Sequence, residues 1–304
     1  MTSTAAETAP STYLERLAAR SAATGTVLCL GIDPDPSALP AGFGTDIAAI
    51  ERFAELLLEA CLPFAAAVKP NLAFFEAYGS AGWAALERLR ARIPVDVPVI
   101  ADAKRGDISS TSARQVVSYF DSLDVDAVTI SPYLGEEAIA AYLERPERFA
   151  YVLCRTSNPG AADIQGLRVR ARWDADGAFT APDEPLWARV ARDVAGWGPG
   201  GTAGLVVGAT APDELRAVRS IAPGLAVLVP GVGAQGGSTD AVLAAGPATA
   251  PPAGGRPGGG LLVNVSRGIA AAAVTEVAAG ASADLVERLS EAARSWSAKL
   301  PVLP

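Results

Sequence analysis

The stretch VPVIADAKRGD (residues 97–107) places a group of charged side chains directly after a short apolar run. Residues 97–101 are apolar at successive positions and rich in β-branched side chains, which is typical of a strand buried on both faces of a parallel sheet. Asp102, Lys104 and Asp107 follow this run. The pattern therefore predicts a buried strand that carries polar chemistry at its carboxyl end.

Seven other apolar runs resemble this one, and amphipathic segments separate them. Strands are predicted at residues 27–32, 65–68, 97–101, 127–130, 150–153, 204–207, 225–229 and 261–265. Helices are predicted at residues 46–62, 81–92, 110–123, 136–142, 186–197, 212–221, 240–245 and 282–300. Eight alternating strand and helix units predict an α/β fold of the (β/α)8 TIM barrel type. A doubly wound sheet is the alternative, but no G-x-G-x-x-G follows the first strand.

The barrel pattern covers most of the 304 residues, so we expect one domain over residues 1–304, with an N-terminal helix before the first strand. Two stretches are irregular, at residues 161–182 and 246–260. The second consists almost entirely of Gly, Ala and Pro. We expect it to be a flexible surface connection that carries no chemistry.

The composition excludes several kinds of catalysis. The chain contains no histidine, which rules out Ser-His-Asp and Cys-His nucleophiles, His-bound zinc and imidazole acid–base catalysis. Proton transfer must therefore use Lys, Asp or Glu. The net charge of -8 argues against nucleic acid or an anionic membrane as partner. An anionic small molecule can still bind where Lys and Arg cluster.

Cysteine usage and hydropathy indicate the compartment. Cys29, Cys61 and Cys154 lie in apolar runs and form no C-x-x-C pair, which favours buried free thiols in a reducing compartment. Residues 1–10 have neither the basic region nor the apolar core of a secretory signal. No apolar stretch approaches the ~18 residues of a membrane span. We therefore expect a cytoplasmic protein.

Polar residues follow seven of the eight predicted strands, where barrels carry their functional side chains. A single polar residue in such a place is usually a solvated loop residue or a helix cap. The accumulation favours a site at one mouth of the barrel. The residues at these strand ends are Asp33; Lys69; Asp102 and Lys104; Ser131 and Tyr133; Arg155, Thr156, Ser157 and Asn158; Gln235; and Ser266 and Arg267.

The third strand end is the most informative. Asp102 and Lys104 are two residues apart on an extended chain, so their side chains point the same way. Gly106 permits a sharp turn that can direct Asp107 outward. An ammonium among carboxylates can transfer a proton and can hold a fixed electrostatic field at a reacting carbon. A purely structural ion-pair network is the alternative.

The last two strand ends predict a phosphate site. The Gly-rich loop at residues 230–237 and the turn Ser266-Arg267-Gly268 each precede a helix, whose first backbone N–H groups bind anions. Arg267 can add a bidentate contact. Barrels of this type usually bind phosphate at these two loops.

Six segments span most of the chain, namely KPNLAFFEAYG (69–79), DAKRGDISST (102–111), VTISPYLG (128–135), RTSNPGA (155–161), PGVGAQGG (230–237) and LVNVSRGI (262–269). Together they resemble the orotidine 5'-phosphate decarboxylase family, in particular its longer bacterial (type 2) branch. The D-x-K-x-x-D core is shared with a wider group of barrels, whereas DAKRGDI together with KPN-x-AFFE is much more specific.

The resemblance implies an enzyme that converts orotidine 5'-phosphate to uridine 5'-phosphate in pyrimidine synthesis without metal or cofactor, as a homodimer with shared active sites. Lys104 would protonate pyrimidine carbon 6, and Asp102 would sit beside the substrate carboxylate. Lys69 would orient Asp102 and the ribose, and Asp107 would enter the partner's active site. Decarboxylation would leave a carbanion at carbon 6. Asp102 would disfavour the ground-state carboxylate, and Lys104 would favour the transition state.

The resemblance also implies how the sugar and the base are bound. Asp33 would hold ribose hydroxyls, and Thr111 would contact the ribose from across the dimer. Ser157 would read the pyrimidine edge. Neighbouring hydroxyl residues are alternatives for the last two roles, namely Thr156, Ser109 and Ser110.

The phosphate would be bound by three residues of the last two strand ends. Gln235 and Arg267 would grip it with their side chains, and Gly268 would contribute its backbone N–H. The resemblance further implies that these distant contacts supply binding energy that closes loops over the substrate.

Other functions remain open on the residues alone. A metal-dependent sugar-phosphate lyase or epimerase of a related barrel needs an acid near the end of the second strand to bind Mg²⁺, where this chain has Lys69. A Schiff-base aldolase would need a lysine with a lowered pKa, and neighbouring carboxylates have the opposite effect. A non-enzymatic phosphate-binding barrel is the third alternative.

Overall fold

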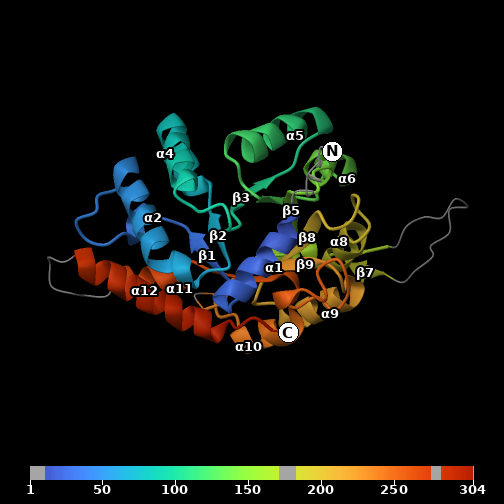
Figure 1. Cartoon of the computed structure of the whole chain (residues 1–304). Coiled ribbons are helices and arrows are strands. Elements are labelled where there is room, and N and C mark those ends of the chain that lie inside the picture. The colour runs from blue at the N-terminus through green and yellow to red at the C-terminus, as the bar shows by residue number, and fades with distance from the viewer. Residues whose placement is uncertain (1–10, 171–182, 234, 275–281, 304) are drawn as a thin grey trace, which may run out of the picture.

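The computed structural model describes residues 11–170, 183–233, 235–274 and 282–303 (Figure 1). Its main sheet contains eight parallel strands in the order β2-β1-β10-β9-β8-β5-β4-β3. Their bounds are β1 Leu28–Ile32, β2 Ala67–Pro70, β3 Ile100–Arg105, β4 Ala127–Ile130, β5 Phe149–Arg155, β8 Ala203–Val207, β9 Ala226–Pro230 and β10 Leu261–Val265.

The two end strands of this order close the sheet. Parallel bridges join Val68 to Val99 and Asn71 to Asp102, between β2 and the segment that contains β3. The backbone N–H of Val68 donates to Pro98 O at 2.9 Å across the same seam. The predicted (β/α)8 barrel is therefore confirmed, with every predicted strand in place.

Each of the eight helices predicted between or after the strands is present, and among the described residues further short α-helices accompany them. The predicted helix at residues 110–123 is divided into α5 and a π-helical turn, Val117–Ser122. The bounds of the predicted helices are α2 Ile47–Cys61, α4 Gly79–Ala91, α5 Ser109–Val116, α6 Glu136–Leu143, α8 Leu186–Val194, α9 Pro212–Ile221, α10 Thr239–Ala245 and α12 Ser282–Lys299. α1 Tyr13–Thr24 lies before the first strand, where an N-terminal helix was expected, and the short helices are α3 Ala73–Glu76, α7 Ala161–Gln165 and α11 Arg267–Ala270.

The irregular segment after β5 contains α7 and a small antiparallel pair. This pair joins β6 Arg168–Val169 to β7 Glu184–Pro185, just before α8. Residues 171–182, which complete the predicted irregular stretch, lie outside the described residues.

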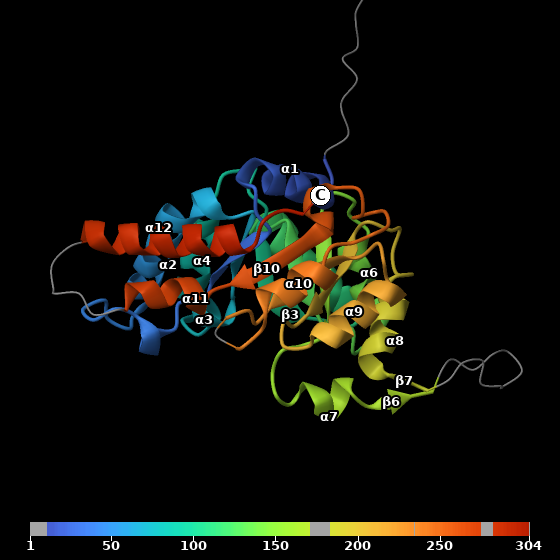
Figure 2. The same cartoon turned by 90° about the horizontal axis from the view of Figure 1, so that it is seen from below.

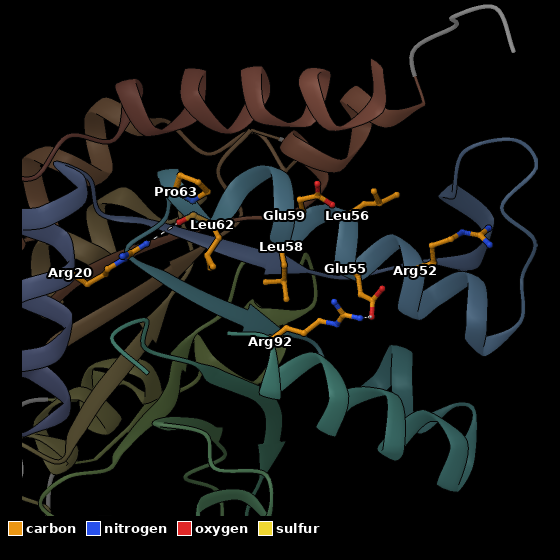
Figure 3. Close-up of a pocket in the computed structure, with 9 residues that line it drawn as sticks. All are labelled: Arg20, Arg52, Glu55, Leu56, Leu58, Glu59, Leu62, Pro63 and Arg92. Atoms are coloured by element: carbon orange, nitrogen blue, oxygen red, sulfur yellow. Dashed lines mark hydrogen bonds and ion pairs between the residues drawn. The ribbon is translucent and has the colours of Figure 1, made fainter. Parts of the chain in front are cut away.

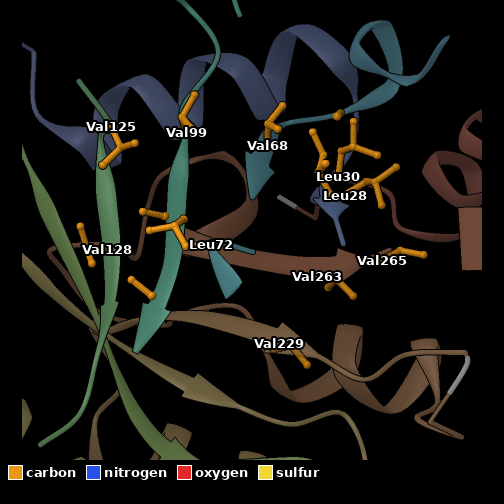
Figure 4. Packing of buried hydrophobic residues seen from close by; sticks show 14 of the residues in the cluster. Leu28, Leu30, Val68, Leu72, Val99, Val125, Val128, Val229, Val263 and Val265 are labelled. Carbon is orange, nitrogen blue, oxygen red and sulfur yellow. The ribbon is translucent and has the colours of Figure 1, made fainter. Parts of the chain in front are cut away.

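The core between strands and helices follows from alternation along each strand. In β1, Leu28, Leu30 and Ile32 belong to the cluster that packs against the helices, whereas Cys29 faces the barrel interior with a second cluster. Figure 4 shows part of this cluster, with buried valine and leucine side chains such as Leu28, Val99 and Val263 around the barrel strands. Burial of each such side chain stabilises the fold by about 1.5–3 kcal/mol.

The amino-terminal mouth of the barrel is closed by α1 and by part of residues 246–260. In Figure 2, α1 lies on one side of the strands and α7 on the other. Tyr13 of α1 stacks on Phe149 with ring centroids 4.7 Å apart. Ala248 and Ala253 join the same interior cluster. The expectation of a surface connection at residues 246–260 is therefore wrong for its buried part, since small residues let this segment pack closely under the barrel.

None of the described helices is long and apolar enough to span a bilayer.

Candidate active site

Most of the predicted site residues converge at the carboxyl ends of the barrel strands. They come from β1, β2, β3, the loop after β9 and the start of α11. Because parallel strands all end at the same mouth, residues far apart in sequence meet there. A cavity of about 120 Å³, open to solvent, is lined by the predicted residues Asp33, Lys69, Asp102, Gln235, Arg267 and Gly268.

Asp102 bridges two ammonium groups at this mouth. Its Oδ2 lies 2.5 Å from Lys69 Nζ, and its Oδ1 lies 2.5 Å from Lys104 Nζ. The Lys69 side chain is only 3% exposed, whereas that of Lys104 is 52% exposed. The buried Lys69 thus holds Asp102 from within the barrel, and the exposed Lys104 faces the opening where a ligand can approach.

Burial and charge oppose each other in this cluster, and charge prevails. Burial would raise the pKa of Asp102, but the ammonium groups of Lys69 and Lys104 outweigh it and hold that pKa well below its ordinary value. Burial would likewise lower the pKa of Lys69, but Asp102 and Asp33 outweigh it and raise the pKa. Asp102 and Lys69 therefore remain an ion pair near neutral pH.

The backbone at Lys104 explains how the cluster is assembled. Lys104 has a φ of 49°, in the left-handed region that costs a non-glycine residue roughly 1–3 kcal/mol. The pairing of β3 with β4 shifts register between Ala101 and Arg105. The prediction that the side chains of Asp102 and Lys104 meet is confirmed, but its stated reason, an extended chain, is wrong. A bulge brings them together.

Thr129 is a site residue that the sequence analysis missed. Its hydroxyl donates to Asp102 Oδ1 at 3.1 Å and accepts from the backbone N–H groups of Ala103 and Lys104, each at 3.0 Å. The side chain is almost fully buried. Thr129 therefore holds both the bulge and the carboxylate. A lone polar residue inside an apolar strand was the available signal.

The predicted phosphate residues lie together around two tight turns. Gly231 has a φ of 97°, and a methyl group built on it would lie 2.5 Å from Gln235 Oε1. Arg267 begins α11 directly after β10, with Gly268 beside it. The close approach of Gln235 to the backbone, together with the exposed Arg267, forms a surface suited to an anion.

Trp296 of α12 braces both of these turns and was also missed. Its Nε1 donates to Gly268 O at 3.1 Å. A methyl group on Gly233 would lie 2.8 Å from the Trp296 ring, and one on Gly268 would lie 3.0 Å from it. The two glycines therefore admit the indole against the backbone of each loop. Nothing in the local sequence of α12 indicated this contact, which depends on the tertiary fold.

Three predicted residues lie apart from the charged cluster. Ser157 adjoins the phosphate loop, since a methyl group on Gly231 would lie 3.1 Å from its Cβ. Asp107 accepts a hydrogen bond from the N–H of Ile108 at 2.7 Å. Thr111 lies in the first turn of α5. Among the described residues, neither Asp107 nor Thr111 contacts Asp102 or the two lysines.

A second cavity lies on the outer surface, bordered by α2 and the turn that follows it (Figure 3). Its arginines already have partners. Arg92 pairs with Glu55 at 2.8 Å, and Arg20 donates to Leu62 O at 3.0 Å. It contains none of the predicted site residues, so the barrel mouth remains the candidate site.

Comparison with known proteins gives one consistent result. Residues 26–282 match the model of the orotidine 5'-phosphate decarboxylase / HUMPS family. An orotidine 5'-phosphate decarboxylase of Thermomicrobium roseum is 42% identical over 285 residues, which are 93% of this chain and 92% of that protein. One of Herpetosiphon aurantiacus is 43% identical over 234 residues, 77% of this chain and 84% of that protein. The solved structure of Leishmania donovani OMP decarboxylase is 36% identical, with a TM-score of 0.75, and the match covers 95% of this chain and 99% of that one. The chain therefore belongs to the orotidine 5'-phosphate decarboxylase / HUMPS family.

Proposed function

We infer that this protein decarboxylates orotidine 5'-phosphate to uridine 5'-phosphate in pyrimidine synthesis. The observation that carries this inference is the array Lys69–Asp102–Lys104 at the barrel mouth, with both carboxylate oxygens of Asp102 held by ammonium groups. A substrate carboxylate placed beside Asp102 is repelled. Loss of carbon dioxide removes that repulsion as the reaction proceeds.

The exposed Lys104 supplies the proton that the reaction requires. The bond between carbon 6 and the carboxylate breaks, carbon dioxide leaves, and the electron pair stays on carbon 6. The Lys104 ammonium stabilises this carbanion and donates a proton to it. The buried Lys69 keeps Asp102 ionised and fixed in place throughout.

The two braced turns at the other side of the cavity bind the phosphate in this proposal. Arg267 supplies a full positive charge, and Gln235 and the N–H of Gly268 add hydrogen bonds. Asp33 binds ribose hydroxyls, which fits its unpartnered, buried Oδ1 in the described structure. Ser157 lies next to Gln235, so its assignment to the pyrimidine edge requires the base to lie against the phosphate loop.

We also propose that two chains share their active sites in a homodimer. Asp107 and Thr111 would reach the partner's ligand, since neither joins the cluster within its own chain. Exposed apolar side chains support an interface, since Ile108, next to Asp107, is 57% exposed and Tyr133, in the loop after β4, is 86% exposed. Mixing Asp107→Ala with Lys104→Ala chains should then restore activity, because some hybrid dimers contain one intact site. No restoration after verified subunit exchange would contradict sharing.

Two further assignments accompany this function. We propose a single domain over the whole chain, which the one continuous barrel supports. We also propose a cytoplasmic location, which suits a chain whose three cysteines are free thiols.

The function is tested by the loss of orotidine 5'-phosphate absorbance with purified protein, in the presence and absence of EDTA. We expect full turnover in both conditions. A metal-dependent lyase or epimerase would lose activity with EDTA, but its Mg²⁺ would have to lie beside the Lys69 ammonium. Absence of any decarboxylation by folded protein would overturn the proposal.

A further inference from the structure

Asn264 is a buried polar residue inside an otherwise apolar strand. It belongs to β10 and is only 8% exposed. Its Oδ1 is buried and has no hydrogen-bond partner among the described residues. A buried amide oxygen without a hydrogen-bond partner costs about 1–3 kcal/mol of stability. Such an oxygen is therefore expected where a ligand or a water molecule donates a hydrogen bond to it.

The neighbouring strand is shaped to admit this amide. A methyl group built on Gly31 would lie 2.9 Å from Asn264 Oδ1 and 3.1 Å from its Nδ2. Gly31 of β1 is itself the register partner of Lys69 in β2. The missing side chain at Gly31 therefore gives the Asn264 amide room beside the charged cluster.

The amide opens into the same cavity as the proposed catalytic residues. Asn264, Asp33, Lys69 and Asp102 all line it. Asp33 Oδ1 is likewise buried without a partner. The cavity thus contains two unpartnered oxygen acceptors from adjacent strand ends, close to the ammonium of Lys69.

We propose that Asn264 binds a hydroxyl of the substrate's ribose and, together with Asp33, selects a sugar with a vicinal diol. The inference rests on the proposed function and extends it to sugar specificity. A diol offers two O–H donors, which match the two acceptors. Each hydroxyl can also accept, so the amide serves in either orientation. A deoxyribose would leave one buried acceptor unsatisfied, which is a strong source of discrimination.

The test measures dissociation constants of uridine 5'-phosphate and of its 2'-deoxy and 3'-deoxy analogues by calorimetry, with wild type, Asn264→Leu and Asn264→Ala. Wild type should bind one deoxynucleotide at least about tenfold more weakly than the ribonucleotide. In Asn264→Leu, affinity for the ribonucleotide should fall about tenfold, and the preference over that deoxynucleotide should vanish. Asn264→Ala should do the same if the leucine variant does not fold.

Thr202→Val provides a matched control. Thr202 also has a buried hydroxyl oxygen without a partner among the described residues, but it precedes β8 at the opposite mouth. This variant should keep the wild-type constants. Equal losses for all three nucleotides in Asn264→Leu would overturn the proposal, since Asn264 would then not recognise a hydroxyl of the ribose. Unchanged affinities would overturn it too. If wild type binds nucleotides with this preference but does not decarboxylate orotidine 5'-phosphate, the proposed function fails instead.

Discussion

The two mouths of the barrel are built from the same eight strands but differ in the polar side chains that are buried at them. At the amino-terminal mouth, Tyr13 and Tyr151 are fully buried, and their hydroxyls hydrogen-bond to each other at 3.1 Å. At the carboxyl-terminal mouth, Asp33 and Asn264 each bury an oxygen that no described residue satisfies. The tyrosine pair at the first mouth satisfies itself, although Thr202 there also buries a hydroxyl oxygen without a partner among the described residues. The two unpartnered oxygens at the second mouth line the candidate site, where a ligand can supply the missing partners.

Charged pairs occur at both mouths, since Arg16 of α1 pairs with the buried Asp126 at 2.7 Å at the amino-terminal one, but the two interiors differ. Lys69 and Asp102 are held inside the carboxyl-terminal mouth, where taking two ions out of water costs several kcal/mol each. The apolar cluster under α1 carries no such cost and stabilises the barrel by burial alone. Substitutions at the two mouths should therefore separate activity from stability.

Lys104→Ala should have the largest effect on activity. Loss of a general acid typically costs ~10²–10⁴-fold in turnover, and loss of the positive charge beside the developing carbanion should add to it. Because the Lys104 side chain is half exposed, the variant should still fold and bind nucleotide. Steady-state turnover and calorimetric nucleotide binding measure the two properties. Turnover within about tenfold of wild type would remove Lys104 from the mechanism.

Phe149→Ala should have the largest effect on stability. The ring is fully buried and packs against both Tyr13 and Tyr151 at the opposite mouth. Truncation of a buried phenylalanine costs about 3–5 kcal/mol in the free energy of unfolding. Denaturant titration should show this loss, while the turnover of the folded protein stays near wild type. A large loss of turnover at unchanged stability would show that the two mouths are not independent.

Asp102→Asn should make stability depend on pH. Without Asp102, burial dominates at Lys69, so its pKa in the folded state falls below the ordinary ~10.4. At a pH between the folded-state and the unfolded-state pKa of Lys69, the unfolded chain binds more protons than the folded protein. The free energy of unfolding therefore rises with pH by up to about 1.4 kcal/mol per pH unit. Thermal melting between pH 6 and pH 10 measures this slope. Wild type should lack it, since its Lys69 has a raised pKa and stays charged in this range.

The sequence predicted the architecture better than the details of the site. Each strand was recognisable because parallel strands buried on both faces are continuous apolar runs, and the residues at their ends had to meet at one mouth. The bulge at Lys104 was not predictable, because it depends on Thr129 of the next strand. Ala253 was placed at the surface because a Gly- and Pro-rich composition indicates loops and does not reveal where a loop packs.

Arg267→Ala should weaken the proposed phosphate site. A charge-assisted contact that is removed from one side costs about 2–4 kcal/mol, or ~30- to ~1000-fold in kcat/KM. The loss should be much smaller for orotidine, which has no phosphate. Arg92, which pairs with Glu55 on the outer surface, provides the control. Arg92→Ala should leave kcat/KM unchanged for both orotidine 5'-phosphate and orotidine. Equal losses on both substrates would mean that Arg267 does not bind the phosphate.

Trp296→Phe should have the smallest effect and tests whether α12 positions the phosphate turns. Phenylalanine keeps an aromatic ring against Gly233 and Gly268 but loses the hydrogen bond from Nε1 to Gly268 O. A hydrogen bond of this kind contributes about 0.5–1.5 kcal/mol, so KM for orotidine 5'-phosphate should rise ~2- to ~10-fold with little change in kcat. Trp197→Phe, after α8 and away from both turns, should leave KM unchanged. Because Trp296 acts through the turns, kcat/KM for orotidine should stay near wild type. A matching loss on orotidine would indicate that Trp296 supports the barrel in general and not the phosphate turns.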